Sequence, residues 1–84
     1  KINIKLKFSI EAGSHLDETP ISDSTKIKLY QDKFLLVEDK VSDNMELRFW
    51  IRAFGDSVEV LKPLKLRKEF KEIAQRMAKT YQKD

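Results

Sequence analysis

The first ten residues carry the pattern that most restricts the fold of this chain. Apolar side chains occupy every second position from Ile2 to Ile10, and lysine, asparagine or serine fills the positions between them. Strict alternation places all the apolar side chains on one face of an extended strand and leaves the other face in water. The sequence therefore predicts a sheet with one buried and one wet face.

Periodicity further along the chain predicts more strands and two longer helices. Residues 11–16 suit a short helix or a turn, in which Gly13 and Ser14 weaken the helical pattern. A turn at Asp32 and Lys33 would join two strands in a β-hairpin, and Pro63 would end a later strand. The expected strands cover 26–31, 34–41 and 58–62, and the expected helices run from about 43 to 54 and from 64 to 82.

The order of these elements defines the expected fold. A β-α-β-β-α-β core belongs to the α+β class and is the ferredoxin-like arrangement, an antiparallel sheet with helices packed on one face. The additional C-terminal helix must cover something, either the sheet of this chain or a neighbouring domain. We therefore expect residues 1–84 to form a single domain of this kind.

The helix before Gly55 has two different faces. Asp43 and Glu46 have the spacing of a capping box, and Gly55 lies where a left-handed C-terminal cap belongs. On a helical wheel, the face expected to enter the core carries Leu47, Trp50, Ile51 and Phe54. The opposite face combines large apolar residues with arginines and is a candidate protein interface: Met45, Arg48, Phe49 and Arg52. The alternative is that the final helix packs over Met45 and Phe49.

Charge is distributed unevenly along the chain, whose net charge is +3. The stretch over 11–46 is acidic and the final helix is basic, so Lys68, Arg76 and Lys79 are candidate phosphate contacts. The alternative is that they form the solvated face of an amphipathic helix. The sequence contains no membrane-spanning apolar run, no signal-peptide pattern and no cysteine, which fits a cytoplasmic protein without a membrane partner. Because the chain starts at Lys1, we expect a fragment of a longer polypeptide.

The side chains that catalysis usually requires are scarce. His15 is the only histidine, and it has no obvious nucleophile and base beside it. One histidine with the flexible acids Asp17 and Glu18 is a weak basis for a metal site. Neither a glycine-rich phosphate loop nor a dinucleotide fingerprint occurs. We therefore expect no enzymatic activity, catalytic residue, cofactor or metal. Tyr30 alone is also no platform for stacking RNA bases.

One stretch resembles a known protein family. A helix with Leu47, Trp50, Ile51, Phe54 and Gly55 is followed by a strand with Val58, Glu59, Val60 and Leu61, and then by Pro63, Leu66 and Arg67. This spacing resembles the WCX domain, the C-terminal extension of bacterial WYL-domain transcriptional regulators. The resemblance covers nearly the whole chain in the order of its elements. It departs from the family near residues 11–16, where the family has a longer first helix.

The resemblance implies a regulatory and assembly domain that contributes to dimerisation and to the effector response. DNA would be bound by an N-terminal domain outside this chain, and a nucleotide or nucleic-acid effector by a WYL domain. Arg67 matches a polar place of the family, which leaves open a ligand contact or a structural bond to a carbonyl or carboxylate. The alternative function is a stand-alone ferredoxin-like module that binds a small ligand or single-stranded nucleic acid on its sheet or its basic helix.

Overall fold

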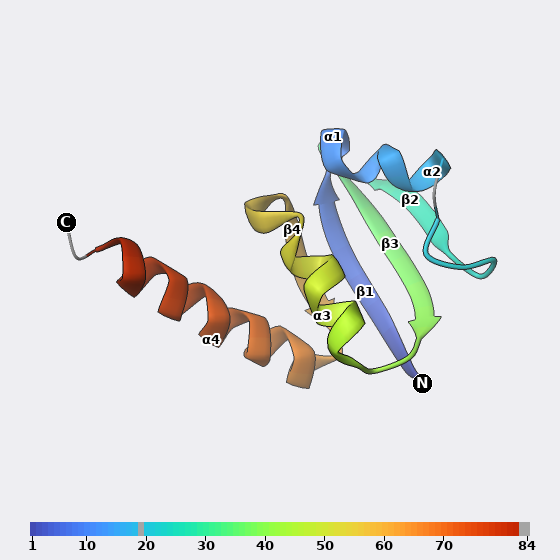
Figure 1. The fold of residues 1–84 in the computed structure, drawn as a ribbon. Coiled ribbons are helices and arrows are strands. Elements are labelled where there is room, and N and C mark those ends of the chain that lie inside the picture. Colours follow the sequence, from blue (N-terminus) through green and yellow to red (C-terminus); the bar gives the residue numbers. More distant parts are fainter. Residues whose placement is uncertain (19, 83–84) are drawn as a thin grey trace.

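The computed structural model describes residues 1–18 and 20–82, with residues 17 and 18 described in their backbone alone. It contains a four-stranded antiparallel sheet in the order β2-β3-β1-β4 (Figure 1). The strands are β1 (Ile2–Ser9), β2 (Lys26–Tyr30), β3 (Phe34–Val41) and β4 (Val58–Lys62). The α+β class and an antiparallel sheet of four strands are thus confirmed.

The pairing of β1 with its neighbours separates the two faces of the sheet. Leu6 lies opposite Val37 of β3 and Val60 of β4, whereas Lys5 lies opposite Glu38. Because directly paired residues point to the same side, the apolar residues of β1 share one face with Val37 and Val60. The alternation of apolar and polar residues in β1 therefore predicted the buried face correctly.

Helices cover the apolar face. The short helices α1 (Ile10–Gly13) and α2 (His15–Glu18) follow β1, α3 (Met45–Arg52) follows β3, and α4 (Leu64–Tyr81) ends the chain. A 3-10 turn, η1 (Gly55–Ser57), leads from α3 into β4. In Figure 1, α3 lies in front of the sheet, and α1 and α2 lie at the end where β1 stops.

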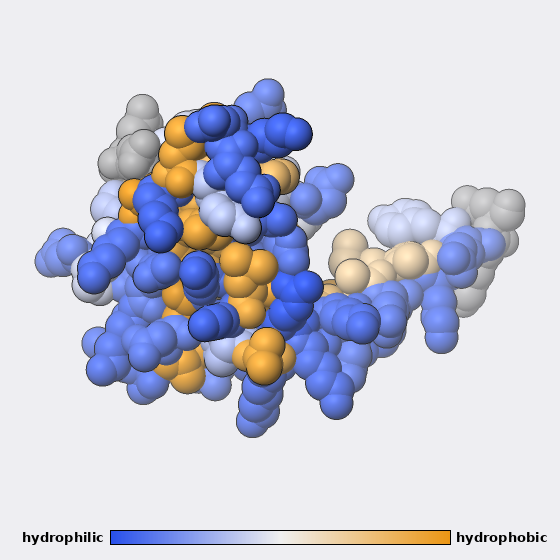
Figure 2. All heavy atoms as spheres, turned by 180° about the vertical axis from the view of Figure 1, so that it is seen from behind, coloured by the Kyte–Doolittle hydropathy of each residue, from blue (hydrophilic) through white to orange (hydrophobic). Residues whose placement is uncertain are grey.

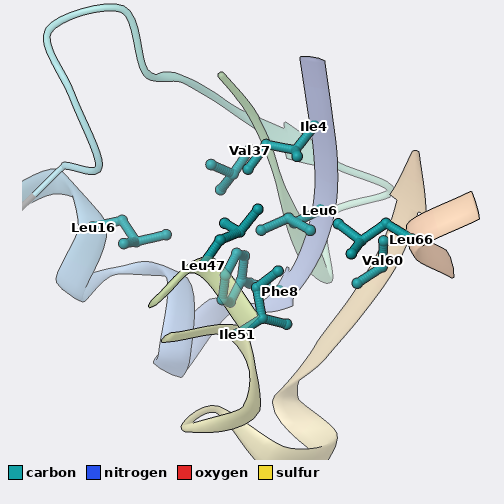
Figure 3. Packing of buried hydrophobic residues seen from close by; sticks show 9 residues of the cluster. All are labelled: Ile4, Leu6, Phe8, Leu16, Val37, Leu47, Ile51, Val60 and Leu66. Atoms are coloured by element: carbon teal, nitrogen blue, oxygen red, sulfur yellow. The ribbon is translucent and has the colours of Figure 1, made fainter. Parts of the chain in front are cut away.

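The core lies between the sheet and these helices (Figure 3). It contains apolar side chains from β1, α2, β3, α3, β4 and α4: Ile4, Leu6, Phe8, Leu16, Val37, Leu47, Ile51, Val60 and Leu66. Leu47 and Ile51 of α3 are buried as predicted, and the partly buried Trp50 and Phe54 pack against the cluster. The rings of Trp50 and Phe54 are edge-to-face with each other at 5.0 Å, and the Phe54 ring lies 4.9 Å from that of Phe8.

Gly13 explains how α1 can lie so close to the sheet. A Cβ atom at this position would lie 2.8 Å from Leu35 Cδ1, so the Leu35 side chain would have to shift, and 3.1 Å from Phe8 Cβ, which is tighter than most real contacts. The short-helix alternative for residues 11–16 was therefore the correct one, although the chain forms two separate turns of helix. The glycine that weakens the helical pattern is what permits its docking.

Several predicted boundaries were wrong by one or two residues. β1 ends at Ser9 rather than Ile10, because the Ser9 hydroxyl accepts a hydrogen bond from Ala12 N and begins α1. Asn44, not Asp43, caps α3, since its Oδ1 accepts a hydrogen bond of 2.9 Å from Leu47 N.

The hairpin turn is also displaced from its predicted position. It is centred on Gln31 and Asp32, whose φ angles are 55° and 57°, and not on Asp32 and Lys33. Gly55 has the expected positive φ of 57°, but it does not cap α3, because α3 ends at Arg52 with Ala53 as its cap and Gly55 begins η1.

The final helix is only half covered by this chain. Its first turns pack against β4 and the core through Leu66, Phe70 and Ile73. Its second half projects away from the sheet, with Met77 53% and Tyr81 78% exposed (Figure 1). Within the part of the chain that the structure describes, no helix is long and apolar enough to cross a membrane.

Candidate functional site

The outer face of α3 presents two large apolar side chains to solvent. Met45 is 55% exposed and Phe49 is 58% exposed, and they lie four residues apart on one side of the helix. The guanidinium of Arg52 lies 5.9 Å from the centre of the Phe49 ring, within the range of a cation–π contact. The final helix does not cover these side chains. We call Met45, Phe49 and Arg52 the α3 patch.

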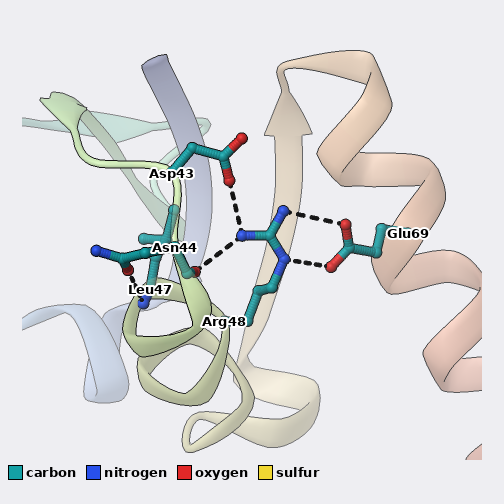
Figure 4. Close-up of polar contacts among 5 residues, drawn as sticks. All are labelled: Asp43, Asn44, Leu47, Arg48 and Glu69. Carbon is teal, nitrogen blue, oxygen red and sulfur yellow. Dashed lines mark hydrogen bonds and ion pairs between the residues drawn. The ribbon is translucent and has the colours of Figure 1, made fainter. Parts of the chain in front are cut away.

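Arg48, the fourth residue of the predicted interface, is engaged inside the molecule (Figure 4). Its Nε donates to Glu69 Oε2 and its Nη2 to Glu69 Oε1 at 3.1 Å, so α3 and α4 are joined by a bidentate ion pair. Its Nη1 donates to Asp43 Oδ1 at 2.7 Å and to the carbonyl of Asn44 at 2.8 Å. Hydrogen bonds to Glu69 and Asp43 raise the pKa of Arg48 still further above its usual value. Arg48 therefore holds two helices together from a largely covered position.

Arg67 forms hydrogen bonds to a carboxylate and a carbonyl of the protein, one of the two roles that the sequence left open. Its Nη1 donates to Glu59 Oε2 at 2.6 Å and to the carbonyl of Val60 at 2.9 Å. Lys7 also lies 3.1 Å from Glu59, so two cations share one carboxylate. Their hydrogen bonds, Arg67 first, lower the pKa of Glu59. This geometry favours the structural interpretation of Arg67, which ties α4 to β4.

The predicted phosphate contacts on α4 lie in the open. Lys68, Arg76 and Lys79 are all exposed, and none of them forms an ion pair within residues 1–18 and 20–82. They lie on the outer, convex surface of α4, so their side chains do not converge on a cavity. His15 lies exposed in α2, and the side chains of Asp17 and Glu18, weighed with it as metal ligands, lie outside the described residues.

An apolar groove of about 440 Å³ runs beside α4. Ile51, Val58 and Val60 form one side, and α4 contributes the other with Phe70, Ile73, Ala74 and Met77. The amphipathic pattern of α4 therefore continues beyond the part of the helix that the core of this chain covers.

Sequence reasoning missed a depression with several lysines on the face of the sheet that no helix covers. This face is turned toward the viewer in Figure 2. A depression of about 380 Å³ there is lined by residues from all four strands and the loop before β2: Asn3, Ile4, Lys5, Ser24, Lys26, Glu38, Asp39, Lys40 and Lys62. Lysines at alternate positions of β1 and β2 were a visible signal. Their convergence depends on the strand order and register, which the sequence did not provide.

Asp39 is the second feature that sequence reasoning missed. It is a buried carboxylate on the apolar face, directly opposite Ile4. Its oxygens accept hydrogen bonds from the hydroxyls of Ser22, Ser24 and Thr25 and from the backbone N–H of Lys40. Burial alone would raise the pKa of Asp39, but these bonds together lower it below its usual range.

Comparisons with known proteins agree with the elements described above. The family model of the WCX domain matches residues 1–78, which is nearly the whole chain. The comparisons with curated proteins and with solved structures gave no match. The match begins at Lys1, directly before β1, and runs into the second half of α4, so it includes the complete sheet, the core and the α3 patch. The chain belongs to the WCX domain family.

Proposed function

We propose that this chain is the C-terminal regulatory and assembly domain of a WYL-type DNA-binding transcriptional regulator in the bacterial cytoplasm. It would contribute to dimerisation and to the effector response, while DNA and a nucleotide or nucleic-acid effector bind to other domains. Membership of the WCX family supports this role. The chain itself would have no catalytic activity and no cofactor.

The fold assignment within this proposal is ferredoxin-like. The elements follow each other as β-α-β-β-α-β, with α1 and α2 in the place of the first helix. The strand order β2-β3-β1-β4 and the layer of helices on one face support the same arrangement. α4 is the additional element.

The α3 patch is the observation that carries the assembly role. Met45 and Phe49 expose more than half of their surface on a well-packed helix whose other face is buried. Methionine, aromatic residues and arginine are the types enriched at the centres of protein interfaces. A contact there would cover apolar area that this chain leaves in water.

Phe49→Asp tests this role because it places a carboxylate at the centre of the proposed contact. Burying an unpaired charge at an interface is strongly unfavourable, so the dimer should weaken by tenfold or more. Sedimentation velocity of the full-length regulator and of the 84-residue chain would measure this. The matched control is Leu29→Asp, because Leu29 is equally exposed at 57% but lies in β2, at the opposite edge of the sheet from β4.

The control should sediment like the wild type. An unchanged association constant for Phe49→Asp, in a protein with wild-type circular dichroism, would show that the α3 patch is ordinary surface. Equal weakening by both variants would point to destabilisation rather than to an interface.

A second candidate function is a stand-alone module that binds a small ligand or single-stranded nucleic acid. The lysines on the uncovered face of the sheet are the observation that favours it. Such a module would bind its ligand as an isolated monomer, whereas the first proposal requires assembly through α3.

A further inference from the structure

The lysines around the 380 Å³ depression form a row that crosses the whole sheet. Lys26 of β2 lies opposite Glu38 of β3, Glu38 lies opposite Lys5 of β1, and Lys5 lies opposite Lys62 of β4. A register shift between β1 and β4 at this point brings Lys62 opposite Lys5, so two like charges face each other. Lys40 lies two residues beyond Glu38 on β3 and faces the same side.

Half of this positive charge is not balanced by the lining, which combines four lysines with the two carboxylates of Glu38 and Asp39. The ammonium group of Lys5 lies 3.7 Å from the carboxylate of Glu38, so these two residues of the row form an ion pair with each other. Among the residues that the structure describes, Lys26, Lys40 and Lys62 have no ion pair. The remaining carboxylate of the lining, that of Asp39, is already saturated by three hydroxyls and a backbone N–H.

Lys26, Lys40 and Lys62 thus line a concave surface without an ion pair to any described residue, and the lining keeps a formal net charge of +2. The volume of 380 Å³ lies at the lower end of the range of small-molecule pockets, roughly 300–1,000 Å³. The side chain of Asn3, another lining residue, can donate hydrogen bonds from its amide, whereas the hydroxyl of Ser24 already donates to Asp39. Donors and positive charges therefore predominate in the lining.

We infer that this lysine pocket, defined by Lys26, Lys40 and Lys62, binds phosphate groups of a ligand that carries at least two of them. A lysine ammonium is a compact charge with three donors, which suits the oxygens of phosphate in many orientations. The three lysines come from three different strands, so a single small anion cannot satisfy all of them as well as linked phosphates can. The phosphates belong either to a free polyphosphate or nucleotide, or to a nucleic-acid backbone.

This inference deepens the second candidate function, on which it rests, because it names the pocket and the phosphate chemistry of the ligand, whereas the first proposal places the effector on a WYL domain. Other basic residues of the chain do not form an equivalent site. Lys68, Arg76 and Lys79 bring the same number of charges but lie on the exposed surface of α4, outside the depression. They therefore provide a control with the same change in net charge.

The test is a calorimetric titration of the 84-residue chain with pyrophosphate at about 20 mM and about 200 mM salt. The pocket variant is Lys26→Gln/Lys40→Gln/Lys62→Gln, and the control is Lys68→Gln/Arg76→Gln/Lys79→Gln. We expect the wild type and the control to bind alike, and the pocket variant to bind at least tenfold more weakly. Circular dichroism and the urea midpoint of each variant establish that the fold is retained.

A parallel titration with a single-stranded oligothymidylate distinguishes the two sources of phosphate. Tighter binding of the oligonucleotide, with a salt dependence that is reduced in the pocket variant, identifies a nucleic-acid backbone as the ligand. Tighter binding of pyrophosphate identifies a small polyphosphate.

Two outcomes overturn the inference. One is that the wild type fails to bind either ligand at the lower salt concentration. The other is that the two triple variants lose affinity equally, because binding would then follow net charge rather than the pocket. Neither outcome bears on assembly through α3, which sedimentation measures independently.

Discussion

Asp39 shows how a single ionised residue can be kept inside a small protein. Its carboxylate lies on the apolar face of the sheet, where desolvation disfavours the charge. The hydroxyls of Ser22, Ser24 and Thr25 reverse this effect and hold the segment before β2 against β3. The hydrogen bonds that attach the segment before β2 to β3 therefore depend on the ionised form of Asp39.

We expect Asp39→Asn to reduce the free energy of unfolding by about 1–3 kcal/mol at pH 7, because an amide group cannot accept all of these hydrogen bonds. The pKa of Asp39 is lowered on folding, so its ionised form stabilises the protein at pH values above the pKa of an unfolded aspartate, about 4. This stabilisation is lost as the pH falls through the folded-state pKa.

Urea denaturation followed by Trp50 fluorescence at neutral and acid pH would measure both effects. Glu59 also has a lowered pKa, but it is present in both proteins, so the difference between them reports Asp39. A difference in stability that is as large at pH 2.5 as at pH 7 would contradict the ionised, hydrogen-bonded state.

At the scale of whole elements, α4 is positioned by few contacts for its length. Two ion pairs, Arg48 with Glu69 and Arg67 with Glu59, join its first half to α3 and β4. Apolar packing by Leu66 and Ile73 adds contacts within the first three turns. The direction of the projecting half is therefore set by contacts in the first three turns.

We expect Glu69→Gln to loosen α4 without unfolding the sheet. Arg48 would lose a partly covered bidentate partner, and a double-mutant cycle with Arg48→Met should give a coupling energy of about 1 kcal/mol. Because the chain has no cysteine, spin labels can be attached at Tyr81→Cys and Lys28→Cys, and the distribution of distances between them should broaden in Glu69→Gln.

Glu72→Gln is the matched control, since Glu72 is exposed on α4 and, in the described part of the chain, has no ion pair. Its distance distribution should match that of the wild type. Identical distributions for all three proteins would show that apolar packing alone fixes the direction of α4.

At the scale of the whole molecule, local patterns in the sequence predicted the helices and strands. Contacts between distant segments determined the lysine pocket and the packing at Gly13. The alternation in β1 and the helical stripe of Leu47 and Ile51 identified the core, because both periods follow from backbone geometry. The lysine pocket depends on four strands meeting in one order. Gly13 allows α1 to lie close to Leu35 and Phe8, and this contact between separate segments cannot be predicted from a local pattern.

The lysines of β2 have a further consequence for how copies of this protein can meet. β2 is an outer strand, so one side of its backbone has N–H and C=O groups without a partner strand. Such an edge can add a strand from another molecule and begin aggregation. Lys26 and Lys28 oppose this, because a second β2 alongside the first would bring four ammonium groups together. Lys26 thus belongs to the pocket and, together with Lys28, also protects the edge of the sheet against pairing, which favours a helical surface as the place where two copies join.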